Sequence, residues 1–215
     1  MYILYLQPLI TDIVFELIHL FYVAPSVITQ CTLLGDPLGP YLSSFLDSAQ
    51  TYCWYNNSLS QVSLAVNRFV VTVLLRLYFF TPSRTLLFSF LQHLLAILIT
   101  ITLQYILPCC KIELAYASYS FREVLIPGVF NYGWAYIKLP AKIACSVIPL
   151  AIYCVILFSI RFVGKRLNLQ SRELSRRRKQ ELKFTAQFAV IAIGYVLSWG
   201  TFSLLPPTTA QWVKG

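Results

Sequence analysis

The stretch WYNNSLSQVSLAVNRF, from Trp54 to Phe69, indicates how the rest of the chain folds. Residues three, four or seven positions apart share one face of an α-helix, which has 3.6 residues per turn. That spacing links polar residues of this stretch with others just before it: Asp47, Gln50, Trp54, Asn57, Ser58, Gln61 and Arg68. A largely apolar helix with one polar face and an Arg at its end predicts a membrane span that faces the interior of a helix bundle.

Composition also favours a membrane protein. The chain has 215 residues, of which 58% are hydrophobic and 12% are charged, whereas soluble domains carry about 25% charged residues. The net charge of +9 does not indicate a nucleic-acid partner, because the positive residues concentrate in one loop between apolar segments. We therefore expect an all-α, polytopic membrane helix bundle in contact with membrane lipid.

Five apolar segments are long enough to cross the hydrocarbon core, which takes about 20 residues. They lie at about residues 9–28, 44–70, 85–107, 141–162 and 182–205. Together they predict a single domain over residues 1–215.

Basic residues set the expected orientation. The loop before the fifth segment holds the run Arg176–Lys179, and the loop after the second holds Arg76 and Arg84. The first loop has no Lys or Arg, so the positive-inside rule places the second and fourth loops in the cytosol. The N-terminus is then cytosolic and the C-terminus external. One further span at each end would reverse both, so we expect the middle of a seven-helix protein without its first and last helices.

Three cysteines fall in the two loops assigned to the outside, where disulfides persist. A bridge from Cys31 to Cys109 or to Cys110 would join the first and third loops, and the choice between the two adjacent cysteines stays open. No cysteine or histidine spacing resembles a zinc site, so we expect no metal. No catalytic motif is present either, so we expect neither an enzyme nor a cofactor.

Three sequence motifs resemble those of a known protein family: FYVAPSVITQ at Phe21–Gln30, CWYNNSLSQVSLAVNRF at Cys53–Phe69 and RRRKQELKFTAQF at Arg176–Phe188. The chain resembles the nematode serpentine chemoreceptors of class x, the Srx family, which are rhodopsin-like G-protein-coupled receptors in outline. The resemblance covers helices two to six of the family's seven. It implies a chemosensory receptor in the plasma membrane of sensory neurons, which binds a small external ligand and signals through a heterotrimeric G protein.

The resemblance also implies a switch at Asn67, Arg68 and Phe69, where rhodopsin-like receptors carry an acid, an Arg and an aromatic residue. An acid would hold Arg68 at rest and release it toward the G protein. The candidate acid is Glu181, which lies 18 residues, or five helical turns, before Trp199. The alternative is that Glu181 is one acid of a solvated basic loop. Asn67 departs from the family pattern, because it replaces the acid that neighbours the Arg.

A ligand pocket is expected on the outer part of the polar face. We assign its wall to Gln50, Trp54 and Asn57, together with Tyr195 and Trp199 of the last segment; the alternative for each is ordinary packing between helices. Asp47, near the outer surface, could bind a cationic ligand, although a capping acid at a helix start is the favoured interpretation.

Two other functions stay open at this point. A small transporter predicts Asp12, Glu16 and Asp47 at linked depths in one cavity, because acids inside a membrane are costly and are usually functional. A truncated, non-signalling polytopic protein is the second alternative.

Overall fold

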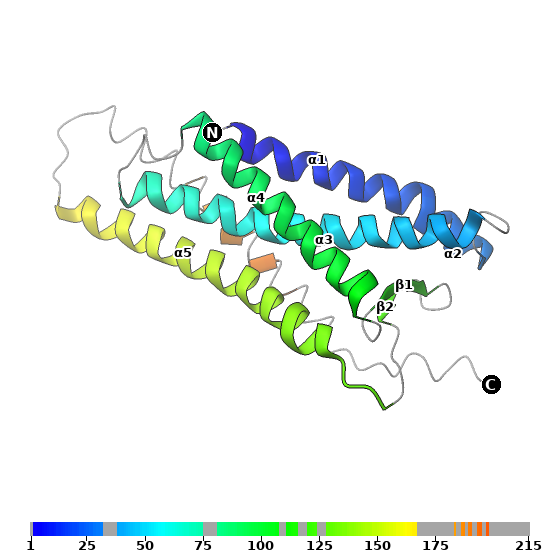
Figure 1. Ribbon diagram of the computed structural model, residues 1–215. Coiled ribbons are helices and arrows are strands. Elements are labelled where there is room, and N and C mark those ends of the chain that lie inside the picture. Colours follow the sequence, from blue (N-terminus) through cyan, green and yellow to red (C-terminus); the bar gives the residue numbers. More distant parts are fainter. Residues whose placement is uncertain are drawn as a thin grey trace. The chain divides into compact units, whose positions relative to one another are not determined.

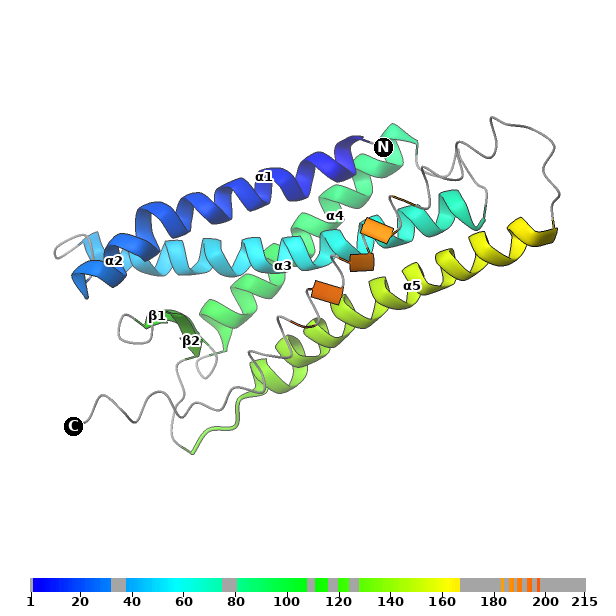
Figure 2. The same ribbon diagram turned by 180° about the vertical axis from the view of Figure 1, so that it is seen from behind.

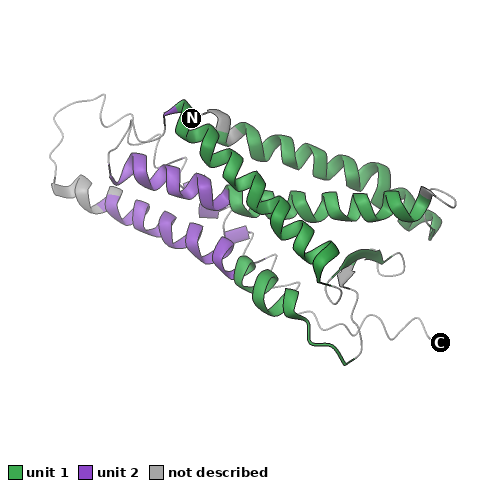
Figure 3. Ribbon diagram, viewed as in Figure 1, with its two compact units in different colours: residues 1–60, 82–142 green, residues 61–81, 143–215 purple. Residues whose placement is uncertain are grey.

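The computed structural model describes residues 2–31, 38–74, 81–107, 111–115, 120–123 and 128–166, with isolated positions between 183 and 197. The chain divides into two compact units, drawn in green and purple in Figure 3. The first unit comprises residues 1–60 and 82–142, and the second comprises residues 61–81 and 143–215. Each unit is described by itself below.

Helices dominate both units, as expected for an all-α bundle. The first helical segment is continuous through α1 (Tyr2–Ile18), η1 (His19–Val23) and α2 (Ala24–Thr29). The later helical elements are α3 (Leu38–Thr72), α4 (Pro82–Ile101), η2 (Thr102–Ile106), η4 (Gly133–Lys138) and α5 (Leu139–Arg166).

Three helices begin six or more residues earlier than the sequence indicates, and one of them is α3, which begins at Leu38 rather than at residue 44. The first begins at Tyr2 rather than at residue 9, and the fourth begins at Gly133 rather than at residue 141. Both expected starts follow a proline directly, at Pro8 and Pro140. The helices continue across these prolines, so the apolar segment alone underestimates the length of the helix.

The three π-helical segments in the described part of the chain share one relation to proline. In each, the residue after the segment donates its backbone N–H to a carbonyl five positions earlier, as in Leu107 N–H to Thr102 O at 2.9 Å. The next residue is Pro25, Pro108 or Pro140. Proline has no N–H and its ring clashes with the carbonyl four residues before it. A wider turn just ahead of proline relieves this conflict. The helix continues through Pro25 and Pro140, whereas η2 is followed by the extended residue Leu107.

Among the described residues, three helical segments are long and apolar enough to cross a membrane: Leu6–Thr29, Pro82–Ile106 and Gly133–Ser159. Their large apolar side chains are mostly exposed, as in Leu9, Phe90 and Phe158. α3 has 35 residues, enough to cross, but it is more polar because its buried face carries hydroxyls and amides. Polar groups inside and apolar groups outside are the arrangement expected of a membrane bundle.

In the first unit, α1, α4 and the first part of α3 lie side by side (Figures 1 and 2). The side of α4 that packs inward carries small and polar residues at helical spacing: Thr85, Ser89, Gln92, Ala96 and Thr100. Small residues let membrane helices approach closely. One core cluster joins Tyr55 of α3 to Ala96 and Leu103 of the α4–η2 segment.

A β-hairpin follows α4 within a region expected to be a loop. Its strands are β1 (Ile112–Ala115) and β2 (Ser120–Glu123), which pair antiparallel. Leu114 and Phe121 of the hairpin join a cluster with Ile18 and Tyr22. The hairpin therefore covers the end of the first helical segment. The four-residue strands are too short to give a clear alternating pattern in the sequence.

The second unit has a small core of its own. Ala65 of α3 packs with Tyr153 and Ile156 of α5, and all three are almost completely buried. Phe69 lies against this cluster. The residues are four or three positions apart on their helices, which places them on one face.

Candidate functional site

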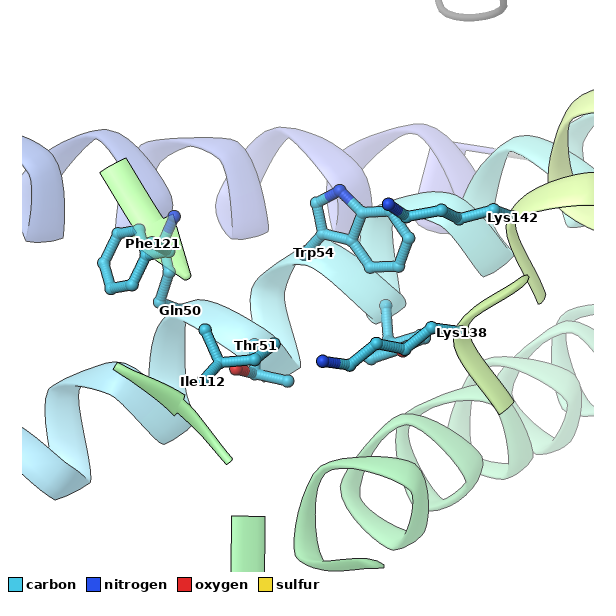
Figure 4. A pocket seen from close by; sticks show the side chains of 8 residues that line it. Gln50, Thr51, Trp54, Ile112, Phe121, Lys138 and Lys142 are labelled. Atoms are coloured by element: carbon cyan, nitrogen blue, oxygen red, sulfur yellow. The ribbon is translucent and has the colours of Figure 1, made fainter. Parts of the chain in front are cut away.

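The first unit contains a cavity of about 290 Å³ between α3, the β-hairpin and the start of the fourth helical segment (Figure 4). The residues that line it are Gln50, Thr51, Trp54, Tyr55, Ile112, Phe121, Lys138 and Lys142. Sites for small molecules in proteins occupy about 300–1,000 Å³. The cavity is therefore at the small end of that range.

α3 supplies the amide and aromatic wall of this cavity. Gln50 and Trp54 are four residues apart and so share a face of the helix, as the sequence predicts. The Trp54 ring stands edge-on to Tyr55, with 4.7 Å between ring centroids. Gln50 is buried, and its Nε2 atom lies 3.4 Å from Nε2 of His19. The Gln50 Oε1 atom is buried with no hydrogen-bond partner among the described residues.

Two lysines supply the opposite wall, and the sequence interpretation missed both. Lys138 is 4% exposed, and Lys142 places its ammonium 5.6 Å from the centroid of the Trp54 ring. They are four residues apart, on either side of Pro140, and Figure 4 shows both entering from the same helical segment. A Lys inside an apolar segment is costly, and that cost is the signal that could have identified Lys142.

A second polar group lies deeper in the first unit and centres on Asn56. Asn56 Nδ2 donates to Thr11 Oγ1 at 2.8 Å, and Gln92 Nε2 donates to Asn56 Oδ1 at 3.1 Å. Gln92 also donates to Ser60 Oγ at 2.7 Å, and Ser89 Oγ donates to Gln7 Oε1 at 2.6 Å. Because uncharged groups satisfy one another across three helices, this cluster is suited to holding the helices together.

Sequence reasoning overlooked this cluster. The available signal was the regular spacing of Ser89, Gln92 and Ala96 in an otherwise apolar helix. Small and polar residues at three- and four-residue intervals mark the packed side of a membrane helix.

Asp47 does not cap a helix, which corrects the favoured expectation. It lies in the interior of α3, is 4% exposed, and accepts a hydrogen bond of 3.1 Å from the Tyr22 hydroxyl. The helix begins nine residues earlier, at Leu38, so the cap position is elsewhere. Asp47 is also absent from the lining of the cavity, which argues against a cationic ligand held there by this acid.

Asn57 points to a different neighbour from the one expected. Its Nδ2 donates to Asp12 Oδ1 of α1, and it is not among the residues that line the cavity. Asp12 and Glu16 are both exposed on α1. Neither of them, nor Asp47, lines either of the two cavities described in the first unit, so the acid arrangement that a transporter predicts is not found there.

In the second unit, Asn67 and Arg68 are both buried on α3, with exposures of 0% and 9%. Both atoms of the Asn67 amide lack a hydrogen-bond partner within the described part of the chain. Phe69 packs against the core cluster of Ala65, Tyr153 and Ile156. Neighbouring residues thus place one aromatic anchor and two polar groups at the same level of the helix.

A family model described as Serpentine type 7TM GPCR chemoreceptor Srx matches residues 2–214. The chain belongs to the Srx family. It is accordingly a multi-pass membrane protein of a chemoreceptor family, and its general role is that of a receptor. No curated protein matches the chain.

Several residues of the expected Srx site lie outside the described residues. They are Tyr195 and Trp199 of the pocket, Glu181 of the switch, and Cys109 and Cys110 of the disulfide. Cys31 is exposed just after α2. Three expectations therefore remain predictions: the place of Tyr195 and Trp199 in the pocket, the Arg68–Glu181 contact, and the disulfide.

The described residues hold no group of three or more His, Cys, Asp or Glu side chains placed to bind a metal ion. The polar groups at the cavity are instead ammonium, amide and hydroxyl groups. These groups bind by charge and hydrogen bonding, which suits ligand recognition.

Proposed function

We propose that this Srx chain is a chemosensory receptor of the plasma membrane, in sensory neurons, that binds a small external ligand and signals through a heterotrimeric G protein. The observation that carries the proposal is the cavity at Gln50 and Trp54. It combines a concave aromatic surface with a few convergent polar groups, which is the usual character of a small-molecule site.

The ligand would bind against α3. Trp54 offers a rigid aromatic surface, and Gln50 offers a buried amide whose Oε1 atom has no partner in the described part of the chain. A ligand donor placed there would satisfy a buried acceptor that otherwise costs free energy. Binding would therefore fix the orientation of a ligand as well as its location.

Signalling would use the same helix near its other end. Arg68 of α3 would contact Glu181 at rest and a G-protein helix in the active state. A ligand that binds the active arrangement more tightly shifts the population toward it. Burial of Arg68 and of its neighbour Asn67 supports this role, since buried polar groups in a membrane bundle are costly and are usually functional.

A pair of variants on α3 tests the ligand site. Trp54→Ala removes the aromatic surface, and Phe45→Ala removes a side chain that is 63% exposed on the same helix. In cells that express each variant, second-messenger responses to a panel of small acids, amines and alcohols are measured. We expect Trp54→Ala to weaken the response by roughly tenfold or more, and Phe45→Ala to leave it unchanged. Equal responses of both variants and the unmodified chain would place the ligand elsewhere.

A further inference from the structure

The charge of the cavity suggests what kind of molecule it takes. Among its eight described lining residues, two are lysines and none is acidic. Lys138 and Lys142 are four residues apart and so project from the same side of their helical segment. A buried ammonium group is stabilised by an anion that accepts its hydrogen bonds.

The rest of the wall is apolar or aromatic. Trp54 and Phe121 offer ring surfaces, and Ile112 adds an aliphatic one. The Lys142 ammonium already lies over the Trp54 ring at 5.6 Å from its centroid, which brings the cation and the aromatic surface to one place. A ligand with a negative end and an apolar body would meet both at once.

The buried side-chain amide of Gln50 sets a third requirement for the ligand. Gln50 is 8% exposed, and its Oε1 atom has no partner within the described residues. An acceptor in that position is satisfied by a hydroxyl or N–H donor. The volume of about 290 Å³ limits the ligand to a small molecule.

We infer that the cavity binds a small organic acid: a carboxylate contacts Lys138 and Lys142, an apolar body packs on Trp54 and Phe121, and a hydroxyl donates to Gln50. This inference rests on the proposed function, because it names the ligand class of the same cavity. It excludes cationic odorants such as amines, which two lysines would repel.

The test uses benzoate, 4-hydroxybenzoate and hexanoate as probes. Each is compared with its neutral amide and with the amine of the same carbon skeleton. Binding to membranes that contain the chain is measured by saturation-transfer NMR, and nucleotide exchange on added G proteins is measured in the same membranes. We expect at least one acid to bind while its amide and amine do not, with the hydroxylated benzoate binding more tightly than benzoate.

Charge variants assign the binding to the cavity. Lys142→Gln should weaken binding of the acid roughly tenfold or more, whereas Lys142→Arg, which keeps the charge, should retain most of it. Lys111→Gln is the matched control, because Lys111 lies outside the lining and pairs with Glu113 at 2.8 Å; it should leave binding unchanged. The Arg variant and the control also show whether loss of binding reflects loss of folding.

The possible outcomes separate the inference from the proposed function. Acids that bind without stimulating nucleotide exchange would support the inference and contradict the signalling proposal. Exchange stimulated by amines or amides, but not by acids, would support the signalling proposal and overturn the inference. Binding of no acid, or binding that Lys142→Gln leaves intact, would also overturn it.

Discussion

The Tyr22 hydroxyl donates a hydrogen bond of 3.1 Å to the carboxylate of Asp47, and both side chains are more than nine-tenths buried. The contact joins the π-helical segment η1 to α3, next to the cluster that holds the β-hairpin. This hydrogen bond gives the buried Asp47 carboxylate a partner within the protein. The burial of an acid at this position is therefore explained without a ligand.

Removing the Tyr22 hydroxyl should destabilise the first unit. Tyr22→Phe leaves the buried Asp47 carboxylate without this donor, at a cost of about 1–3 kcal/mol. The thermal unfolding midpoint of the purified protein should fall. Tyr105→Phe is the control, because the Tyr105 hydroxyl meets Ser48 at an exposed position. Equal midpoints for the two variants would contradict a structural role for the Tyr22–Asp47 contact.

Two adjacent asparagines should differ in their importance for folding. Asn56→Ala removes contacts with Gln7, Thr11 and Gln92. Interhelical hydrogen bonds in membranes contribute about 0.6 kcal/mol each, so roughly 2 kcal/mol should be lost. Asn57→Ala removes one contact at a half-buried position and should cost less than about 1 kcal/mol.

Denaturant titration of both asparagine variants in detergent measures the difference in the free energy of unfolding. A larger loss for Asn57→Ala than for Asn56→Ala would show that the Asn56 cluster does not hold the helices together.

The sequence predicted the membrane bundle, and it placed Gln50 and Trp54 on one face of a helix that lines a cavity; their place in a ligand pocket stays a prediction. Gln50 and Trp54 could be assigned because the polar residues on one face of a single helix recur at a spacing that is visible in one sequence. Lys138 was not found, because it joins the helix that carries Lys142 only when η4 continues into α5 across Pro140. Lys142 lay inside the expected segment at residues 141–162 and was overlooked there. A proline normally marks a helix boundary in sequence, and here the π-helical turn before it removes that boundary.

Partners of polar groups were harder to predict than the groups themselves. Asp47 was expected near the outer surface as a capping acid, but it is buried in α3 and accepts a hydrogen bond from Tyr22. Tyr22 lies in another helical segment, and nothing in sequence spacing links the two. Asn57 was expected in the pocket wall, yet it donates to Asp12 of α1 and does not line the cavity. Contacts between helices depend on packing geometry, which a single amino-acid sequence does not record.

The proposed lock predicts a gain of signalling on removal of its acid. Glu181→Ala would free Arg68, so basal second-messenger production should rise at equal surface expression. Lys183→Ala is the matched control, because Lys183 is an exposed residue close by in the sequence. Unchanged basal signalling in Glu181→Ala would count against the Arg68–Glu181 contact.

The most direct test measures nucleotide exchange on purified heterotrimeric G proteins in the presence of the panel of small acids, amines and alcohols. The G proteins are added to membranes that contain either the unmodified chain or Arg68→Gln. Lys111→Gln is the control variant, and all membranes are prepared with equal amounts of the chain. We expect the unmodified chain and Lys111→Gln to accelerate exchange on at least one G protein, and Arg68→Gln to abolish the acceleration. Exchange at the rate of empty membranes with every G protein, or acceleration that Arg68→Gln leaves intact, would contradict this expectation.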